Sequence, residues 1–126
     1  MNYRFVGVGA ICALLSVAIG AFGAHMLKSH LTAEMQAIYE TGVQYHMVHS
    51  LGLIIIGVLA ALMPASKHLV RAGWAMLIGI ILFSGSLYAL SVTGIKPLGA
   101  ITPLGGVAFL YGWLSVALAA FQHKKS

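Results

Sequence analysis

The most conspicuous deficit in this chain is charge. Only 7% of its 126 residues are Asp, Glu, Lys or Arg, whereas a soluble domain carries roughly 25%. Aspartate is missing, so a Ser-His-Asp triad is excluded. The two carboxylates, Glu34 and Glu40, fall on different faces of any helix that contains both. Chemistry that needs paired carboxylates is therefore not expected.

Cysteine is almost as scarce. Cys12 stands alone inside an apolar run, so it cannot form an intrachain disulfide. This excludes a membrane dithiol oxidoreductase, which needs a pair of thiols. The sequence also lacks a Gly-rich phosphate loop and a basic stripe with interleaved aromatic residues. We therefore expect no nucleic-acid partner, and we expect Cys12 to be a small buried residue.

Long apolar runs make up most of what is present, and 60% of the residues are hydrophobic. A helix of about 20 residues crosses a hydrocarbon core of about 30 Å while satisfying its own backbone hydrogen bonds. The sequence therefore predicts one all-α domain over residues 1–126, an antiparallel bundle of four transmembrane helices. Its spans are expected at residues 5–24, 41–63, 73–92 and 103–121, with the second helix starting near Ala33 and ended by Pro64.

The distribution of basic residues predicts the orientation. Lys28 and Lys96 fall in the first and third loops, while the other five lie at the two ends of the chain and in the second loop: Arg4, Lys67, Arg71, Lys124 and Lys125. The positive-inside rule then places both termini in the cytoplasm. The first run also resembles a secretory signal peptide. We expect it to be retained as a membrane helix.

Small residues recur at helical spacing in the first run, at Gly9, Ala13, Ser16, Gly20 and Ala24. Such a ladder lets another helix approach closely. It predicts either packing inside the bundle, which we favour, or a seam between copies of the chain. A homo-oligomer held through small-residue faces is therefore one expected assembly.

Polar side chains gather at the head of the second run, in ETGVQYHMVHS at residues 40–50. Tyr45, His46 and His49 share one arc of a helix, because positions three and four apart are neighbours. Glu40 and Gln44 lie on another flank. Within lipid, all five must face the bundle interior or water.

The first and third runs bring further polar groups to the same side of the membrane. We therefore expect a polar pocket that opens near the external leaflet. Its predicted lining is His25, Glu40, Gln44, Tyr45, His49, Ser84, Ser86 and Tyr88.

This cluster permits several kinds of function. His46 and His49 could hold Zn or Cu if His25 or Glu40 added a third ligand. Two histidines from different helices could ligate haem. The cluster could also carry protons for transport. The remaining interpretation is a hydrogen-bonded network that fixes helix register. H-x-x-H is a weak metal signal, so His25, His46 and His49 are weak metal candidates only.

Several motifs together resemble a known family. They are GAFGAH at 20–25, Tyr45-x-x-x-His49, FSGSLYAL at 83–90, ITPLGG at 101–106 and GW at 112–113. In this order they resemble the small bacterial membrane family called domain of unknown function 423, over essentially the whole chain. The resemblance implies a four-helix protein of the cytoplasmic (inner) membrane and no particular activity. Members usually carry Gln at the position of His46, so the resemblance leaves His25 and His49 as the better pair.

The sequence thus predicts a non-enzymatic, multi-pass binding or scaffold protein that needs no cofactor. Its partners are expected to be the lipid bilayer and an unidentified small ligand, lipid or helix at the polar pocket. The alternative is an oligomeric transporter or channel component for small solutes or protons. The third hypothesis is a metal- or haem-dependent membrane enzyme. The apolar inner half of the helices (IIIGVLAALM and VALAAF) argues against a continuous path for solutes.

Overall fold

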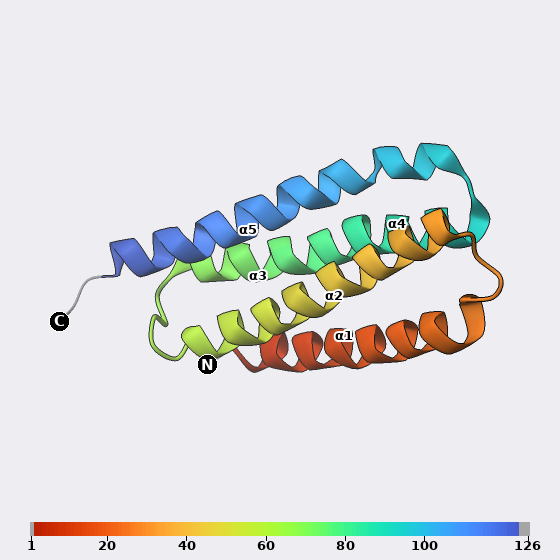
Figure 1. The fold of residues 1–126 in the computed structure, drawn as a ribbon. Coiled ribbons are helices and arrows are strands. Elements are labelled where there is room, and N and C mark those ends of the chain that lie inside the picture. Colours follow the sequence, from red (N-terminus) through yellow and green to blue (C-terminus); the bar gives the residue numbers. More distant parts are fainter. Residues whose placement is uncertain (1, 124–126) are drawn as a thin grey trace.

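The fold was analysed in a computed structural model, which describes residues 2–123. Within this range the chain forms four long helical segments that run antiparallel to one another (Figure 1). Two of them contain a π-helical turn, and a short 3-10 turn precedes the last. The elements are α1 (Tyr3–Phe22), η1 (Gly23–Leu27), α2 (Ala33–Leu59), α3 (Lys67–Gly79), η2 (Ile80–Ser84), α4 (Gly85–Thr93), η3 (Lys96–Ala100) and α5 (Thr102–Gln122).

The helices pack in chain order. α1 lies along α2, α2 lies along the continuous segment α3–η2–α4, and that segment packs against α5 (Figure 1). α1 and α5 are therefore the outer helices, and α2 keeps one broad face outside the bundle. We call the end with the turn at residues 28–32 and η3 the loop end. The opposite end, which holds Asn2 and Gln122, is the terminal end.

The predicted four-helix membrane fold is confirmed, because all four segments are long and apolar enough to cross a bilayer. α2 starts at Ala33, as the sequence predicts, and the Thr32 hydroxyl caps it by accepting a hydrogen bond from the Met35 N–H at 3.1 Å. Its predicted end at Met63 was wrong. α2 stops at Leu59, and only turns continue toward Pro64.

The third helical segment also differs from the prediction. It starts at Lys67 rather than Gly73, because the basic stretch after the loop forms its first turns. The predicted orientation is a separate matter and stays a prediction. Two of the basic residues on which it depends, Lys124 and Lys125, lie outside the described residues.

The small-residue ladder of α1 is used inside the bundle. A Cβ on Gly9 would lie 2.7 Å from the Ile54 side chain, and one on Gly20 would lie 3.1 Å from Val43. Ser16 is fully buried between these glycines and contacts α2 through its hydrogen bond to the sulfur of Met47, 3.4 Å away. These small residues therefore let the α1 backbone approach α2 closely.

The core fills the bundle toward the terminal end. Leu53, Ile56 and Met76 are at most 1% exposed, and other apolar residues surround them. Large apolar side chains also cover the outside of every helix, which in water would be an aggregation hazard and in a bilayer is the lipid-facing surface. The bundle is thus a membrane domain with a tightly filled interior.

Candidate functional site

The buried polar side chains lie near the middle of the membrane helices. His46 stands midway between Ala33 and Leu59, the two ends of α2, and His49 is one turn closer to the terminal end. Both histidines are about 95% buried, with exposed fractions of 4% and 5%. Both histidines therefore lie near the middle of α2 rather than at its loop end.

His49 is fixed by hydrogen bonds at both ring nitrogens. Its Nδ1 lies 2.7 Å from the Tyr45 carbonyl, which can only accept, so Nδ1 carries the proton. The Trp113 indole N–H, which can only donate, lies 3.0 Å from Nε2. Phe109 stacks on the ring at a centroid distance of 3.5 Å. His49 is therefore a neutral imidazole that links α2 to α5, with no lone pair left for another ligand.

His46 points to a different neighbour. Its Nδ1 lies 2.8 Å from the Tyr88 hydroxyl, which joins α2 to α4. The Tyr88 ring packs against Tyr39, and the Tyr39 hydroxyl donates to the Ile19 carbonyl of α1 at 2.6 Å. A chain of hydrogen bonds and aromatic packing thus runs from α1 through α2 to α4. It ties these three helices together.

The serines of FSGSLYAL complete this network. The Ser84 hydroxyl donates to the Gly42 carbonyl of α2 at 2.7 Å. Ser86 shares a 2.6 Å hydrogen bond with the Thr102 hydroxyl, at the start of α5. Both serines are buried. They form interhelical hydrogen bonds, which is a common role of Ser and Thr in membrane bundles.

The other predicted residues of α2 face outward. Gln44 is exposed, and Tyr45 is 42% exposed although its ring packs on Phe83 at 4.5 Å. Glu40 is exposed too, and its Oε1 accepts from the Gln36 amide at 3.4 Å. We define the α2 groove as the shallow depression of about 570 Å³ lined by Val43, Gln44, Tyr45, Met47, Val48 and His49.

His25 lies apart from these residues. It is exposed on η1, where the neighbouring Gly23 packs against Tyr39. His49 is ten positions further along α2 than Tyr39, which corresponds to about 15 Å of helix. The structure therefore does not bring His25 and His49 together. His46 and His49 also point to different helices, and residues 2–123 contain no group of three potential ligands around one point.

The network includes residues that sequence reasoning did not assign to the site. Trp113 and Phe109 of α5 hold His49, and Thr102 holds Ser86. A signal for Trp113 was available, because an indole N–H in the middle of a membrane helix requires an acceptor. His49 at matching depth is that acceptor.

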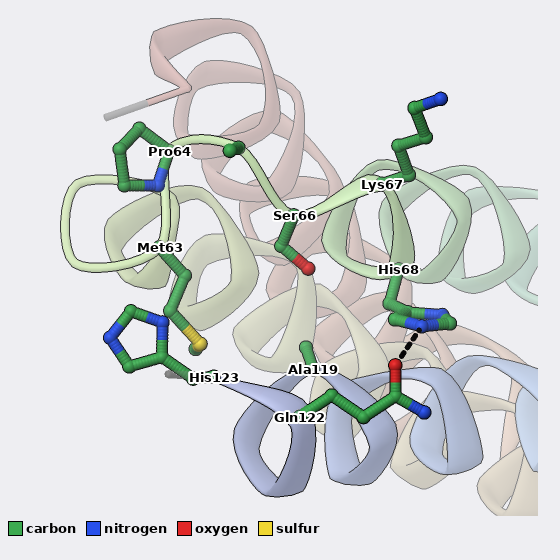
Figure 2. A pocket seen from close by; sticks show the side chains of 9 residues that line it. Met63, Pro64, Ser66, Lys67, His68, Ala119, Gln122 and His123 are labelled. Carbon is green, nitrogen blue, oxygen red and sulfur yellow. Dashed lines mark hydrogen bonds between the residues drawn. The ribbon is translucent and has the colours of Figure 1, made fainter. Parts of the chain in front are cut away.

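A second depression, of about 370 Å³, lies at the terminal end (Figure 2). His68 of α3 and Gln122 of α5 lie on one side of it and pair through Nε2 and Oε1 at 3.0 Å. Met63 and His123 lie on its other side (Figure 2). Its polar pair joins the ends of two helices, and the cleft is remote from the buried network.

Known proteins resemble this chain over almost its full length. It is 51% identical over 119 residues to the UPF0382 membrane protein YwdK of Bacillus subtilis, covering 94% of this chain and 97% of the relative. It is 46% identical over 118 residues to the UPF0382 membrane protein SH2409 of Staphylococcus haemolyticus, covering 94% and 95% of the two chains. No solved structure matches.

A family match covers the centre of the chain. The family is described as "Protein of unknown function (DUF423)" and matches residues 19–106, which include the whole of α2, α3 and α4. The four spanning helices and the bacterial relatives identify a multi-pass protein of the bacterial cytoplasmic membrane. The chain belongs to the membrane-protein family DUF423.

Proposed function

We propose that this protein is a non-enzymatic membrane scaffold that binds another membrane component at the α2 groove. The main support for this proposal is the contrast between the two sides of α2. Apart from Gln36 Oε1, the polar side chains facing the interior are paired within the chain, whereas Gln44 and the Tyr45 hydroxyl face outward and make no hydrogen bond with the described residues. An unpaired polar group inside a bilayer is costly, so this face calls for a partner.

The pairing of the interior argues against catalysis or metal binding there. Both nitrogens of His49 are engaged, and Nδ1 of His46 is engaged by Tyr88. A metal at Nε2 of His49 or at Nδ1 of His46 would have to break an interhelical hydrogen bond. The histidines therefore serve the packing of the bundle in this proposal.

The packing below His49 argues against transport through one copy. Leu53, Ile56 and Met76 fill the interior between His49 and the terminal end, and none is more than 1% exposed. A proton or solute that reached His49 would meet a solid apolar core rather than further polar groups. Binding at the outside of α2 is the function that this geometry supports better.

The proposal predicts capture of a partner at one outward face only. A photoreactive amino acid would be placed at Val48 of the α2 groove and, as matched controls, at outward positions of similar depth on the other helices: Leu14, Ile78 and Leu110. Irradiation of living cells is expected to give a discrete adduct at Val48, and Gln44→Leu should reduce its yield. Equal adducts at all four positions, or an adduct at Val48 that Gln44→Leu leaves unchanged, would count against the proposal.

A further inference from the structure

We infer that the partner at this face is a second copy of the chain, which packs through its own α2. This inference rests on the proposed function, because it names the occupant of the same surface. The two copies would lie parallel, related by a two-fold axis along the membrane normal, since every copy inserts with the same orientation. The contact would be centred on Gln44.

The outward residues of α2 follow the spacing of a helix pair. The spacing between successive residues alternates between four and three, so they form one stripe along the helix. We call this stripe the seam, and it consists of Ala37, Thr41, Gln44, Val48, Leu51, Ile55 and Val58. The four seam residues from Val48 to Val58 are between 43% and 53% exposed. This 4-3 spacing fits left-handed packing of two helices that cross at about 20°.

The types of residue on the seam also suit two strands. Every seventh position carries a β-branched residue, at Thr41, Val48 and Ile55. β-branched residues in this set favour a parallel pair over larger assemblies, while the alternate set is mixed: Ala37, Gln44, Leu51 and Val58. Gln44 is the one amide on the seam, and an amide that pairs across a helix contact favours the register in which it meets its partner.

Gln44 is complementary to itself. Its carboxamide carries both a donor and an acceptor, and neither is used within the described residues. Across a two-fold axis, the two carboxamides can exchange two hydrogen bonds, which satisfies both groups in one contact. A different partner would need a matching polar group at the same depth, whereas a second copy supplies it by symmetry.

The same arrangement accounts for the other two polar groups of this face. In a parallel helix pair, two flanking positions of the two helices lie side by side. One is the residue just before a seam residue, and the other is the partner's residue just after the following seam residue. These positions are Glu40, before Thr41, and Tyr45, after Gln44. The Tyr45 hydroxyl of one copy can then donate to Glu40 of the other, twice by symmetry. One interface thereby satisfies all three outward polar side chains.

Disulfide trapping tests this interface directly. In a Cys12→Ala background, Val48→Cys and Leu51→Cys are expected to give a covalent dimer when native membranes are oxidised. Leu14→Cys on α1 and Leu110→Cys on α5 are the controls, because they are more exposed and lie at similar depth. Equal trapping at the control positions would overturn the inference, because it would reflect random collision.

Variants of Gln44 give the second readout. In single-molecule subunit counting at a fixed low density, Gln44→Leu is expected to raise the apparent dissociation constant roughly three- to tenfold, whereas Gln44→Asn should retain most of the dimer. Gln44 is exposed, so both variants should fold. A Gln44→Leu protein that dimerises like the parent would contradict the inference.

The adduct formed at Val48 separates the two proposals. An adduct with the mass of two chains supports both. An adduct with a different protein or a lipid, without a dimer, would overturn the second copy and leave the proposed function standing. A Val48 position that captures nothing, in a protein that counts as a monomer, would overturn both.

Discussion

Gly105→Ala is expected to destabilise the protein by about 2 to 3 kcal/mol, a magnitude typical of overpacking a filled site. A Cβ on Gly105 would lie 2.4 Å from the backbone nitrogen of Phe83, and backbone cannot rotate away as a flexible side chain can. α5 would have to move off η2. That movement would disturb the adjacent Ser86–Thr102 hydrogen bond, which joins α4 to α5. Reversible unfolding in mixed detergent micelles measures the effect.

Gly106→Ala is the matched control. Gly106 is the next residue on α5, but the nearest atom to its Cβ, on the Phe83 ring, is 4.0 Å away. Both variants gain the same intrinsic helix propensity, up to about 1 kcal/mol in favour of alanine. Gly106→Ala should therefore be neutral or slightly stabilising. If the two variants were equally stable, the close approach of α5 to η2 would be incorrect.

His49→Leu is expected to lower the free energy of unfolding by about 2 to 3 kcal/mol, because it leaves the Trp113 N–H, in the middle of a membrane helix, without an acceptor. Trp113→Phe should cost less, since it removes the donor and leaves only the Nε2 acceptor of His49 unpaired. The double variant removes both groups. A double-mutant cycle should then give a favourable coupling of about 0.6 to 2 kcal/mol, the range of interhelical hydrogen bonds in membranes.

Tyr111→Phe serves as the control for this cycle. Tyr111 lies on the same helix but faces outward and is 48% exposed, so it should not couple to His49. If the coupling between His49 and Trp113 is no larger than the coupling between His49 and Tyr111, the His49–Trp113 hydrogen bond does not stabilise the fold. The same unfolding assay measures all of these variants.

The sequence predicted the fold well, because its signal is simple. Four apolar runs of sufficient length admit only helices in lipid, and the cap at Thr32 gave the start of α2 to the residue. The boundaries at Met63 and Gly73 failed for a common reason. Hydropathy locates the apolar stretch, whereas helix boundaries depend on the local backbone. Here α2 ends before Pro64, and α3 begins after Ser66.

The candidate site was harder to predict, because one helix can turn its polar residues to two sides. Tyr45 and His46 are adjacent, yet His46 is buried and Tyr45 is exposed. The sequence alone placed both on one arc of the helix. Only the position of α5 shows which side is interior, and that position depends on glycines such as Gly105, whose spacing carries little information by itself.

His25 was not predicted to lie far from His49, because the sequence does not specify how α1 and α2 are aligned in depth. Its position at the end of the first span put it on the same side of the membrane as the cluster, which is all that topology specifies. Depth along a neighbouring helix depends on register, and register follows from contacts such as Gly23 on Tyr39. The two histidines of the expected pair therefore lie at different levels.

In the proposed function, the hydrogen bonds of the fold occupy His49, and recognition is left to the outward face of α2. Solid-state nitrogen NMR of the protein labelled at histidine and tryptophan, in lipid bilayers, tests this occupation directly. We expect that His49 carries its proton on Nδ1 and that its unprotonated Nε2 correlates with the Trp113 indole N–H. A proton on Nε2, or a metal-bound Nε2, would contradict it and return His49 to the list of catalytic or metal-binding candidates.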